Sequence, residues 1–486
     1  MSMDGRSRWL ALYVLCLGDV MIVLDSTVVN VALPSIRDDL GFSETSLAWV
    51  VNAYILTFGG FLLLGGRLGD LFGYRRLFLG GITLFTLASL ACGLATSQEA
   101  LVTARAVQGL GGAVVSAVAL SLVMNLFTET ADRAKAMGIF GFVLSGGGTA
   151  GVILGGVLTD VLDWHWIFLV NIPVGIAVIA LSLALLPDIR GQAATGRLDV
   201  AGAVIVTAAL MLAVYAIVNG NDDGWLTTRT LGLLAASAVL LVVFLGLEAR
   251  VSSPLVPLSL FRNRNVSVSN VVGVLMAGGM FAWFFLSALY MQRILDYSPL
   301  EVGLAYLPGT VLWGSASLFL SDRLVLRFGI KPPLVVGVGV MTIGLILLAR
   351  APVDGNWAVD ILPSTLAIGL GAGIAFNPIL LAAMSDVVPE ESGLASGVVN
   401  TSFMMGGAVG LAVLASVAAS RTESLEAGGD GPLVALNGGY QVAFLVGALF
   451  TVAAAAVAGA LLRAKVAAAG HEGEHAIGSP AAAEAD

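Results

Sequence analysis

Apolar stretches of about twenty residues recur along nearly the whole chain and alternate with short polar connections. A helix of about twenty residues is long enough to cross the hydrocarbon core of a bilayer. The pattern predicts fourteen membrane-spanning helices, which makes the chain an all-α polytopic membrane protein. The predicted spans are 9–33, 47–67, 77–97, 100–125, 134–159, 165–187, 199–219, 230–249, 266–291, 300–321, 332–350, 359–385, 394–420 and 438–462.

The composition agrees with a membrane protein and excludes several other classes. Hydrophobic residues make up 58% of the chain and charged residues 11%, roughly half the charged share of a soluble domain. The net charge of −9 does not indicate nucleic-acid binding, because the acids lie mostly in connections and in the tail. Cys16 and Cys92 both lie in apolar stretches, which predicts neither a disulfide nor a metal site. We expect no cofactor and no nucleic-acid partner.

The basic residues predict the orientation. Seventeen of the 23 Lys and Arg residues fall on one side of the predicted spans and five on the other. The positive-inside rule then places both termini in the cytoplasm, and we expect the protein to lie in the inner membrane of a bacterium. Asp19, Asp25 and Asn30 interrupt the first apolar run, so we expect it to be a retained span and not a signal peptide.

Polar connections divide the chain into four predicted parts. Residues 1–187 form a six-helix bundle, 188–265 an inserted helix pair with cytoplasmic flanks, 266–465 a second six-helix bundle, and 466–486 a disordered tail. The connection after the second helix carries an acid, a glycine and bases in both bundles, including Asp70 and Gly73 in the first and Asp322 and Gly329 in the second. Two like halves are common in secondary transporters, and we expect a monomer.

An ionisable residue inside a span is costly and therefore indicates function, and three such residues stand out: Asp19, Asp25 and Arg105. On a helix, Asp19 and Asn30 share one face, and Asp25 lies about 120° away. An arginine can hold a nearby carboxylate ionised, and protonation would release the pair, which makes Arg105 a candidate coupling element. The alternative is that both acids only pair with neighbouring helices.

Three further groups of residues are candidates for transport. Glycines in the fifth span favour close approach of a neighbouring helix, or ordinary packing of small residues: Gly147, Gly151, Gly155 and Gly156. An acid among bases suggests a charge latch at a cytoplasmic gate, or only a positive-inside loop: Gly66, Asp70, Gly73, Arg75 and Arg76. Aromatic and amide residues suit a cavity for varied apolar ligands, although they also fit a core or lipid face: Trp283, Tyr306 and Asn377, together with Asp19, Asn30 and Gln108.

Several motifs resemble one transporter family. The segment 24–34, LDSTVVNVALP, resembles the first-helix signature of the fourteen-spanner drug:proton antiporters of the major facilitator superfamily. The segment 66–76, GRLGDLFGYRR, is similar to the superfamily's motif between helices two and three, and the stretch from Leu101 through Arg105 to Gly109 is similar to its fourth-helix motif. The segment 164–173, WHWIFLVNIP, resembles the signature entering helix six. Together with segments 297–300 and 393–397, the similarity covers nearly the whole chain.

The resemblance implies a major facilitator fold with two six-helix bundles, an extra helix pair, a central cavity and alternating access. It implies that Asp25 carries the proton, that Arg105 is its electrostatic partner, and that small lipophilic or cationic drugs are exported. Two positions depart from the family pattern: Val152 replaces a proline of the fifth-helix motif, and His165 replaces an arginine. The rival functions are proton-driven import of a nutrient or siderophore, and a membrane sensor or integral enzyme.

Overall fold

The computed structural model describes residues 5–43, 45–127, 129–187, 199–251, 254–385, 387 and 392–463. Every regular element in these ranges is helical. The helices are α1 Gly5–Leu40, α2 Ala48–Phe72, α3 Tyr74–Gly93, α4 Gln98–Leu126, α5 Thr130–Val161, α6 Trp166–Leu169, α7 Asn171–Leu185, α8 Val200–Asp223, α9 Thr228–Glu248, η1 Leu258–Arg262, α10 Arg264–Arg293, α11 Pro299–Ser315, η2 Ala316–Ser321, α12 Asp322–Phe328, α13 Lys331–Leu348, η3 Trp357–Ile361, α14 Leu362–Met384, α15 Ser392–Ala427 and α16 Pro432–Leu461.

The prediction of an all-α membrane protein with fourteen spans is confirmed. Thirteen helical segments of the described chain are long and apolar enough to cross a membrane. Three of them are composite: α6 with α7, α11 with η2 and α12, and η3 with α14. α5 is the fourteenth span, since it has 32 residues and ends in the apolar stretch Ala150–Val161. Each predicted span overlaps one of these segments.

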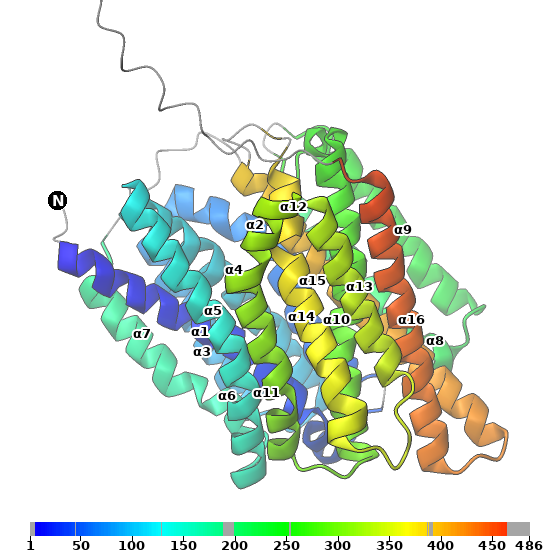
Figure 1. Ribbon diagram of the computed structural model, residues 1–486. Helices are drawn as coiled ribbons and strands as arrows, with labels where there is room; N and C mark the ends of the chain where they lie inside the picture. Colours follow the sequence, from blue (N-terminus) through cyan, green and yellow to red (C-terminus); the bar gives the residue numbers. More distant parts are fainter. Residues whose placement is uncertain are drawn as a thin grey trace, which may run out of the picture.

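The helices form two groups, with the pair α8 and α9 at the edge of the second (Figure 1). In the first group, α4 packs against α2 and α3, and α1 packs against α5. In the second group, α10 packs against α15 and α16, and α13 packs against α14. The groups meet where α5 contacts α11 and α2 contacts α15, and α8 packs against both α2 and α15. This is the predicted arrangement of two six-helix bundles with an added helix pair.

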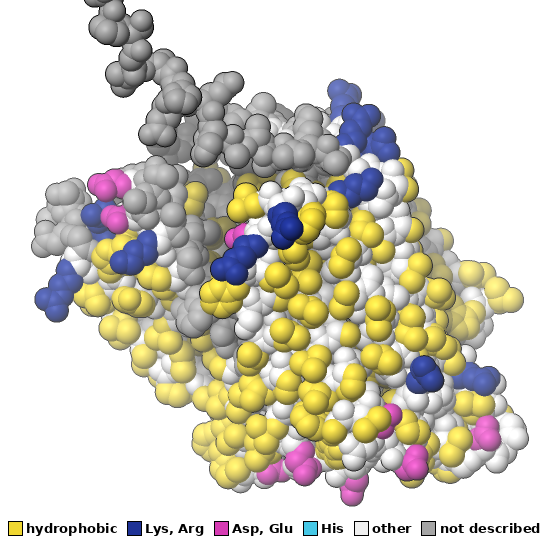
Figure 2. Space-filling model, in the orientation of Figure 1, with side chains coloured by type: hydrophobic (Ala, Val, Ile, Leu, Met, Phe, Trp, Pro, Cys, Tyr) yellow, Lys and Arg dark blue, Asp and Glu magenta, His cyan; other side chains and the backbone are white. Residues whose placement is uncertain are grey.

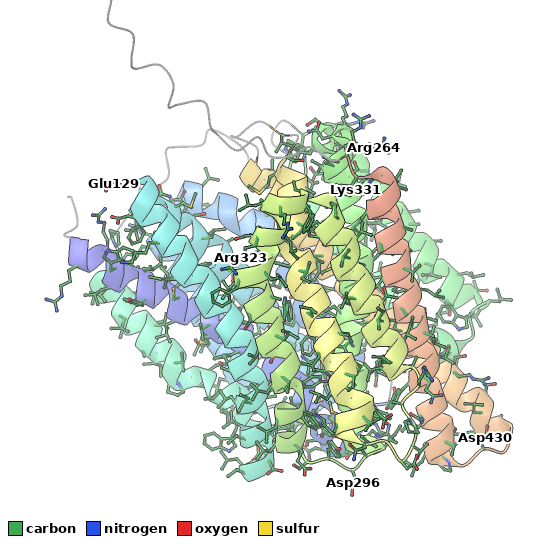
Figure 3. All side chains as sticks on the ribbon, in the orientation of Figure 1. Glu129, Arg264, Asp296, Arg323, Lys331 and Asp430 are labelled. Atoms are coloured by element: carbon green, nitrogen blue, oxygen red, sulfur yellow. The ribbon has the colours of Figure 1, made fainter. Side chains whose placement is uncertain are left out.

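Charged side chains gather at the two ends of the molecule, and a broad apolar band separates them (Figure 2). Arg264, Arg323 and Lys331 lie toward one end, while Asp296 and Asp430 lie at the opposite end (Figure 3). An apolar band between two charged ends is the surface that a bilayer requires.

Glycines bring α5 close to helices of both groups. A side-chain carbon built onto Gly155 would lie 2.7 Å from the Val28 carbonyl oxygen of α1. A carbon built onto Gly156 would lie 2.8 Å from the Pro299 carbonyl oxygen of α11. On α11, Gly303 approaches the Val152 carbonyl oxygen equally closely. These distances leave no space for a larger residue, so small residues are what allow the backbones to touch.

The connection after the second helix of each bundle was predicted as a polar loop. Most of each connection is helical instead, which corrects the prediction. Asp70 lies in α2, and Arg75 and Arg76 lie in the first turn of α3, with only Gly73 between the helices. Gly73 has a φ of 92°, a conformation that glycine adopts without steric cost. The second bundle repeats this turn at Gly329, which has a φ of 78° and follows α12. The polar connection 188–198 and the tail 466–486 lie outside the described residues.

Candidate functional site

Asp25 of α1 and Arg105 of α4 form an ion pair in the interior of the first bundle. Nη1 of Arg105 lies 2.5 Å from Oδ2 of Asp25, and the two side chains are 1% and 0% exposed. Removing two charges from water carries a large penalty, which their attraction offsets only if the remaining polar atoms are also bonded. The neighbours of this pair therefore determine what the pair can do.

The carboxylate of Asp25 receives further hydrogen bonds from two helices. The side-chain amide of Gln108 on α4 donates to Oδ1 at 2.7 Å. The side-chain amide of Asn171 on α7 donates to the same oxygen at 3.0 Å. Hydrogen bonds to a carboxylate favour its ionised form. Asp25 is thus held by three side chains, from helices other than its own.

Arg105 has partners that do not depend on Asp25. Its Nε donates to the Val50 carbonyl oxygen of α2 at 3.0 Å, and its Nη1 donates to Oε1 of Gln108 at 2.8 Å. The guanidinium carbon lies 4.3 Å from the centre of the Tyr54 ring and 5.5 Å from that of Phe168. Cation–π contacts of this kind stabilise a desolvated guanidinium. Arg105 is therefore fastened to α2 and α4 independently of its acidic partner.

The sequence analysis assigned no role to Asn171, Ser89 or Tyr54, although all three belong to this cluster. Besides bonding Asp25, Asn171 donates to Oγ of Ser89 at 3.0 Å. Ser89 in turn donates to the Phe168 carbonyl oxygen at 2.9 Å. The available signal was a single amide in the apolar run of segment 164–173, but the sequence does not indicate which helix that amide faces.

Asp19 forms a second buried acidic site on α1. Its side chain accepts a 2.5 Å hydrogen bond from Oγ of Ser116 on α4, and the residue is 2% exposed. Oδ2 of Asp19 and the hydroxyl of Tyr54 find no hydrogen-bond partner among the described residues. Tyr54 interacts electrostatically with both Asp19 and Asp25. α4 therefore contacts both acids of α1, through Ser116 at Asp19 and through Arg105 and Gln108 at Asp25.

The other candidate cavity residues have partners within the protein. Asn30 donates to the Ser26 and Thr27 carbonyl oxygens of its own helix, at 3.2 and 3.4 Å. The amide of Asn377 donates to the Ser317 carbonyl oxygen of η2 at 3.1 Å.

Two aromatic candidates belong to a cluster on α10 and α11. The Tyr306 hydroxyl donates to the Phe284 carbonyl oxygen at 2.8 Å and lies 2.7 Å from Oγ of Ser287. Trp283 packs edge-on against Tyr306 with ring centres 5.6 Å apart. Nε1 of Trp283 is buried and lacks a hydrogen-bond partner in the described part of the chain.

The candidate gate and glycine residues occupy defined places. Arg75 donates a hydrogen bond to the Leu183 carbonyl oxygen at the end of α7, and Arg76 is exposed. Gly66 lies within α2. The side chain of Asp70 lies outside what the structure describes, so the charge latch stays a prediction.

The helix-five glycines face two different helices. Gly147 lies against Val23 and Gly151 against Leu24 and Thr27, all on α1, and Gly155 faces the same helix. Gly156 faces α11 instead.

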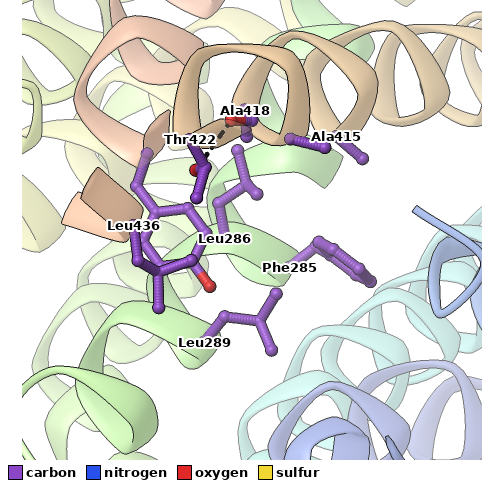
Figure 4. A pocket seen from close by; sticks show the side chains of 9 residues that line it. Phe285, Leu286, Leu289, Ala415, Ala418, Thr422 and Leu436 are labelled. Atoms are coloured by element: carbon purple, nitrogen blue, oxygen red, sulfur yellow. Dashed lines mark hydrogen bonds between the residues drawn. The ribbon is translucent and has the colours of Figure 1, made fainter. Parts of the chain in front are cut away.

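A narrow apolar pocket lies among α10, α15 and α16 (Figure 4). The hydroxyl of Thr422 at its wall already donates to the Ala418 carbonyl oxygen at 2.9 Å, and Tyr440 interacts with Arg293. Its polar groups are thus engaged within the protein, and we assign it no role in transport.

Known proteins with similar sequences are transporters. The sequence pattern of the Major Facilitator Superfamily matches residues 15–411. The puromycin resistance protein pur8 of Streptomyces alboniger is 39% identical over 92% of this chain and 90% of its own length. The cephamycin export protein CmcT of Amycolatopsis lactamdurans is 38% identical over 85% of each chain.

Solved structures share the fold. A bacterial homologue of the human lysosomal transporter Spinster, in an inward-facing and occupied conformation, aligns with a TM-score of 0.67 at 15% identity. That alignment covers 94% of this chain and 97% of the other. The chain therefore belongs to the Major Facilitator Superfamily, among its drug-efflux members, and it is a membrane transporter and not an enzyme.

Proposed function

We propose that the protein exports small lipophilic or cationic antibiotics across the cytoplasmic membrane of a bacterium, in exchange for protons and by alternating access. The observation that carries this proposal is the buried ion pair of Asp25 and Arg105, which joins α1 to α4 at 2.5 Å. The names of the relatives support antibiotics as substrates, since they refer to puromycin resistance and cephamycin export.

The proposed coupling begins with the proton on Asp25. Protonation would remove the charge that Arg105, Gln108 and Asn171 stabilise. Arg105 would keep its bonds to Val50 and Gln108, so the released element is α1 and not α4. A proton that binds Asp25 from one side and leaves to the other would thus alternately loosen and fasten α1.

The proposed substrate contact is Asp19. Its Oδ2 is buried and has no hydrogen-bond donor among the described residues, whereas the oxygens of Asp25 are both bonded. A cationic or hydrogen-bonding substrate could supply the missing partner. Asn30, Gln108, Trp283, Tyr306 and Asn377 remain candidates for the wall of the same cavity.

The proposed orientation follows from charge. Most of the basic side chains in this view lie toward one end of the molecule (Figure 2), and the positive-inside rule assigns that end to the cytoplasm. Both termini would then be cytoplasmic. We further propose that the protein is a monomer, with the four parts 1–187, 188–265, 266–465 and 466–486. The gate residues would lie at this same end.

The proposal is tested in proteoliposomes with an imposed pH gradient. Puromycin and a cephamycin are supplied in turn, and drug movement and proton flux are both recorded. We expect the parent to move at least one drug against its gradient, and a protonophore to abolish that movement. Asp25→Asn keeps the size of the side chain but cannot ionise, so it should bind drug while losing gradient-driven transport. Asp160→Asn, which changes an exposed acid of α5, is the matched control.

Three outcomes would contradict parts of the proposal. Parental drug-driven proton flux in Asp25→Asn would move the proton role to another residue, with Asp19 first. Equal drug affinity in Asp19→Asn and the parent would remove Asp19 from the substrate site. Drug movement that ignores the pH gradient in the parent itself would exclude proton exchange.

A further inference from the structure

A second pair of buried acids lies in the helix pair α8 and α9, outside the site described above. Asp199 precedes α8 and is 5% exposed, and Glu248 is the last residue of α9 and is 3% exposed. The start of α8 and the end of α9 thus lie at the same end of the pair, and residues 249–263 lead from there to α10. Acidic residues are almost never this buried without a partner.

Each acid uses one oxygen for a backbone group. Oδ1 of Asp199 accepts from the Gly202 amide at 2.7 Å and caps α8. Oε2 of Glu248 accepts from the Val256 amide at 3.0 Å. This second bond ties the connection after α9 to the end of that helix.

The remaining oxygens of the two acids meet over Gly202. A side-chain carbon built onto this glycine would lie 2.5 Å from Oδ2 of Asp199 and 2.9 Å from Oε1 of Glu248. The carboxyl group of Asp199 interacts electrostatically with that of Glu248. Neither oxygen finds a donor in the ranges that the structure describes. Two buried acceptors that face one another are unfavourable unless something positive lies between them.

A proton fits this position better than a metal ion. Magnesium and calcium take six or more oxygen ligands, whereas only two oxygens are free here. The backbone group that is hydrogen-bonded to Glu248 is the N–H of Val256, which donates and cannot ligate a cation. Asp199 is the only charged group recorded against Glu248 in the described residues, and α2 contributes the apolar Leu64 nearby.

The segment 254–262, which we call the linker, contacts both groups of helices. Leu255 packs with Leu64 of α2 and Ala203 of α8. Leu260 packs with Val398 of α15, and Leu63 of α2 contacts the same cluster. The linker therefore lies against α2 of the first bundle and α15 of the second. These two helices form one of the contacts between the bundles, and that contact must change if the bundles move relative to one another.

We propose that Glu248 carries a proton that it donates to Oδ2 of Asp199, and that this proton-binding site fastens the linker against α2 and α15. When the proton leaves, two like charges face one another in a buried position and repel. Glu248 then gives up its bond to the Val256 amide, and the linker separates from the two helices. The site is distinct from Asp25 and would make the contact between the bundles sensitive to pH.

The test measures how accessible the linker is as pH changes. Leu260→Cys places a thiol at a position that is 2% exposed, and Ser259→Cys places one at the exposed neighbouring position. Both are made in the full chain in detergent and labelled with a maleimide between about pH 5.5 and 9. Labelling of Cys16 and Cys92, both buried, is subtracted with the unsubstituted chain. The labelling rate of Leu260→Cys is divided by that of Ser259→Cys. This ratio removes the pH dependence of thiol chemistry, because both thiols ionise over the same pH range.

We expect the ratio to rise about tenfold with pH, which corresponds to the loss of one strong electrostatic contact. Asp199→Asn keeps the cap on α8, and its amide can donate permanently to Glu248, so its ratio should stay low at every pH. Asp223→Asn, at the other end of α8, should behave as the parent. A flat ratio in the parent, or the same rise in Asp199→Asn, would overturn the proposal. Since no transport is measured, failure here is separate from failure of proton-coupled export.

Discussion

Gly303→Ala is expected to separate α5 from α11. The added carbon would lie 2.8 Å from the Val152 carbonyl oxygen and 3.6 Å from the Ile153 Cα. A real side-chain carbon does not approach an oxygen so closely, and the atoms that face it belong to backbone that cannot rotate away. The two helices must therefore move apart, or the conformation in which they touch must become less populated.

The size of the effect follows from packing energetics. Inserting one carbon into a tightly packed interface typically costs about 1–3 kcal/mol. Only conformations in which α5 and α11 touch at Gly303 carry this cost. If another conformation of the transport cycle separates these helices, its population should rise by about 5- to 150-fold relative to the touching one.

The assay is a distance measurement between spin labels on Val161 of α5 and Val311 of α11, which are 69% and 49% exposed. Gly339→Ala on α13 is the matched control, since nothing lies within 4 Å of the added carbon. Gly303→Ala should populate longer distances, while the control should reproduce the parent. Identical distance distributions in all three folded proteins would refute the argument from close packing.

Three further predictions concern single side chains. Asn171→Ala removes a donor from Asp25 and should lower stability by about 1–3 kcal/mol; Asn219→Ala, which loses a bond on an exposed face of α8, should not, as thermal unfolding in detergent would reveal. Gly73→Ala forces alanine into a φ of 92° and should cost about 1–2 kcal/mol, whereas Gly80→Ala, in open space, should unfold at or above the parental temperature. Val152→Pro removes a helical hydrogen bond of α5 and should change the transport rate at normal membrane abundance; equal rates would mean that the missing proline is neutral.

The fold could be predicted because membrane insertion leaves a strong signal in the sequence. Each span needs a long apolar run, and these runs predicted fourteen spans, each of which overlaps a helical segment of the structure. The largest deviations are at helix ends: α1 continues to Leu40, α12 extends the tenth predicted span to Phe328, and α15 continues to Ala427. Helices continue past the apolar run where charged residues are good helix formers, until a glycine such as Gly73 or Gly329 turns the chain.

The sequence predicted the ionisable residues of the site but not how they are paired or which neutral residues surround them. Arg105 was expected to have an acid near it, because an unpaired charge in a membrane is so unfavourable, and α1 carries two acids in the middle of its apolar run. Which of Asp19 and Asp25 pairs with it depends on how α1 and α4 are rotated. The roles of Asn171 and Tyr54 depend on where α7 and α2 pass, and no local pattern encodes that.

Arg105 has more contacts that do not depend on its ionic partner than Asp25 has. In the proposed cycle, protonation therefore releases α1 and leaves α4 in place. Arg105 retains the Val50 carbonyl, Gln108 and two aromatic faces when Asp25 is neutral, so protonation changes little on α2 and α4. Asp25 belongs to α1, whose far end bonds the second bundle through Gln292 and the Val31 carbonyl oxygen at 2.7 Å. The same helix packs on α5 at Gly151 and Gly155, and α5 in turn contacts α11 at Gly156. A change at Asp25 would thus reach two contacts between the bundles through α1: the bond between Gln292 and Val31, and the contact of α5 with α11. No movement of α4 is needed.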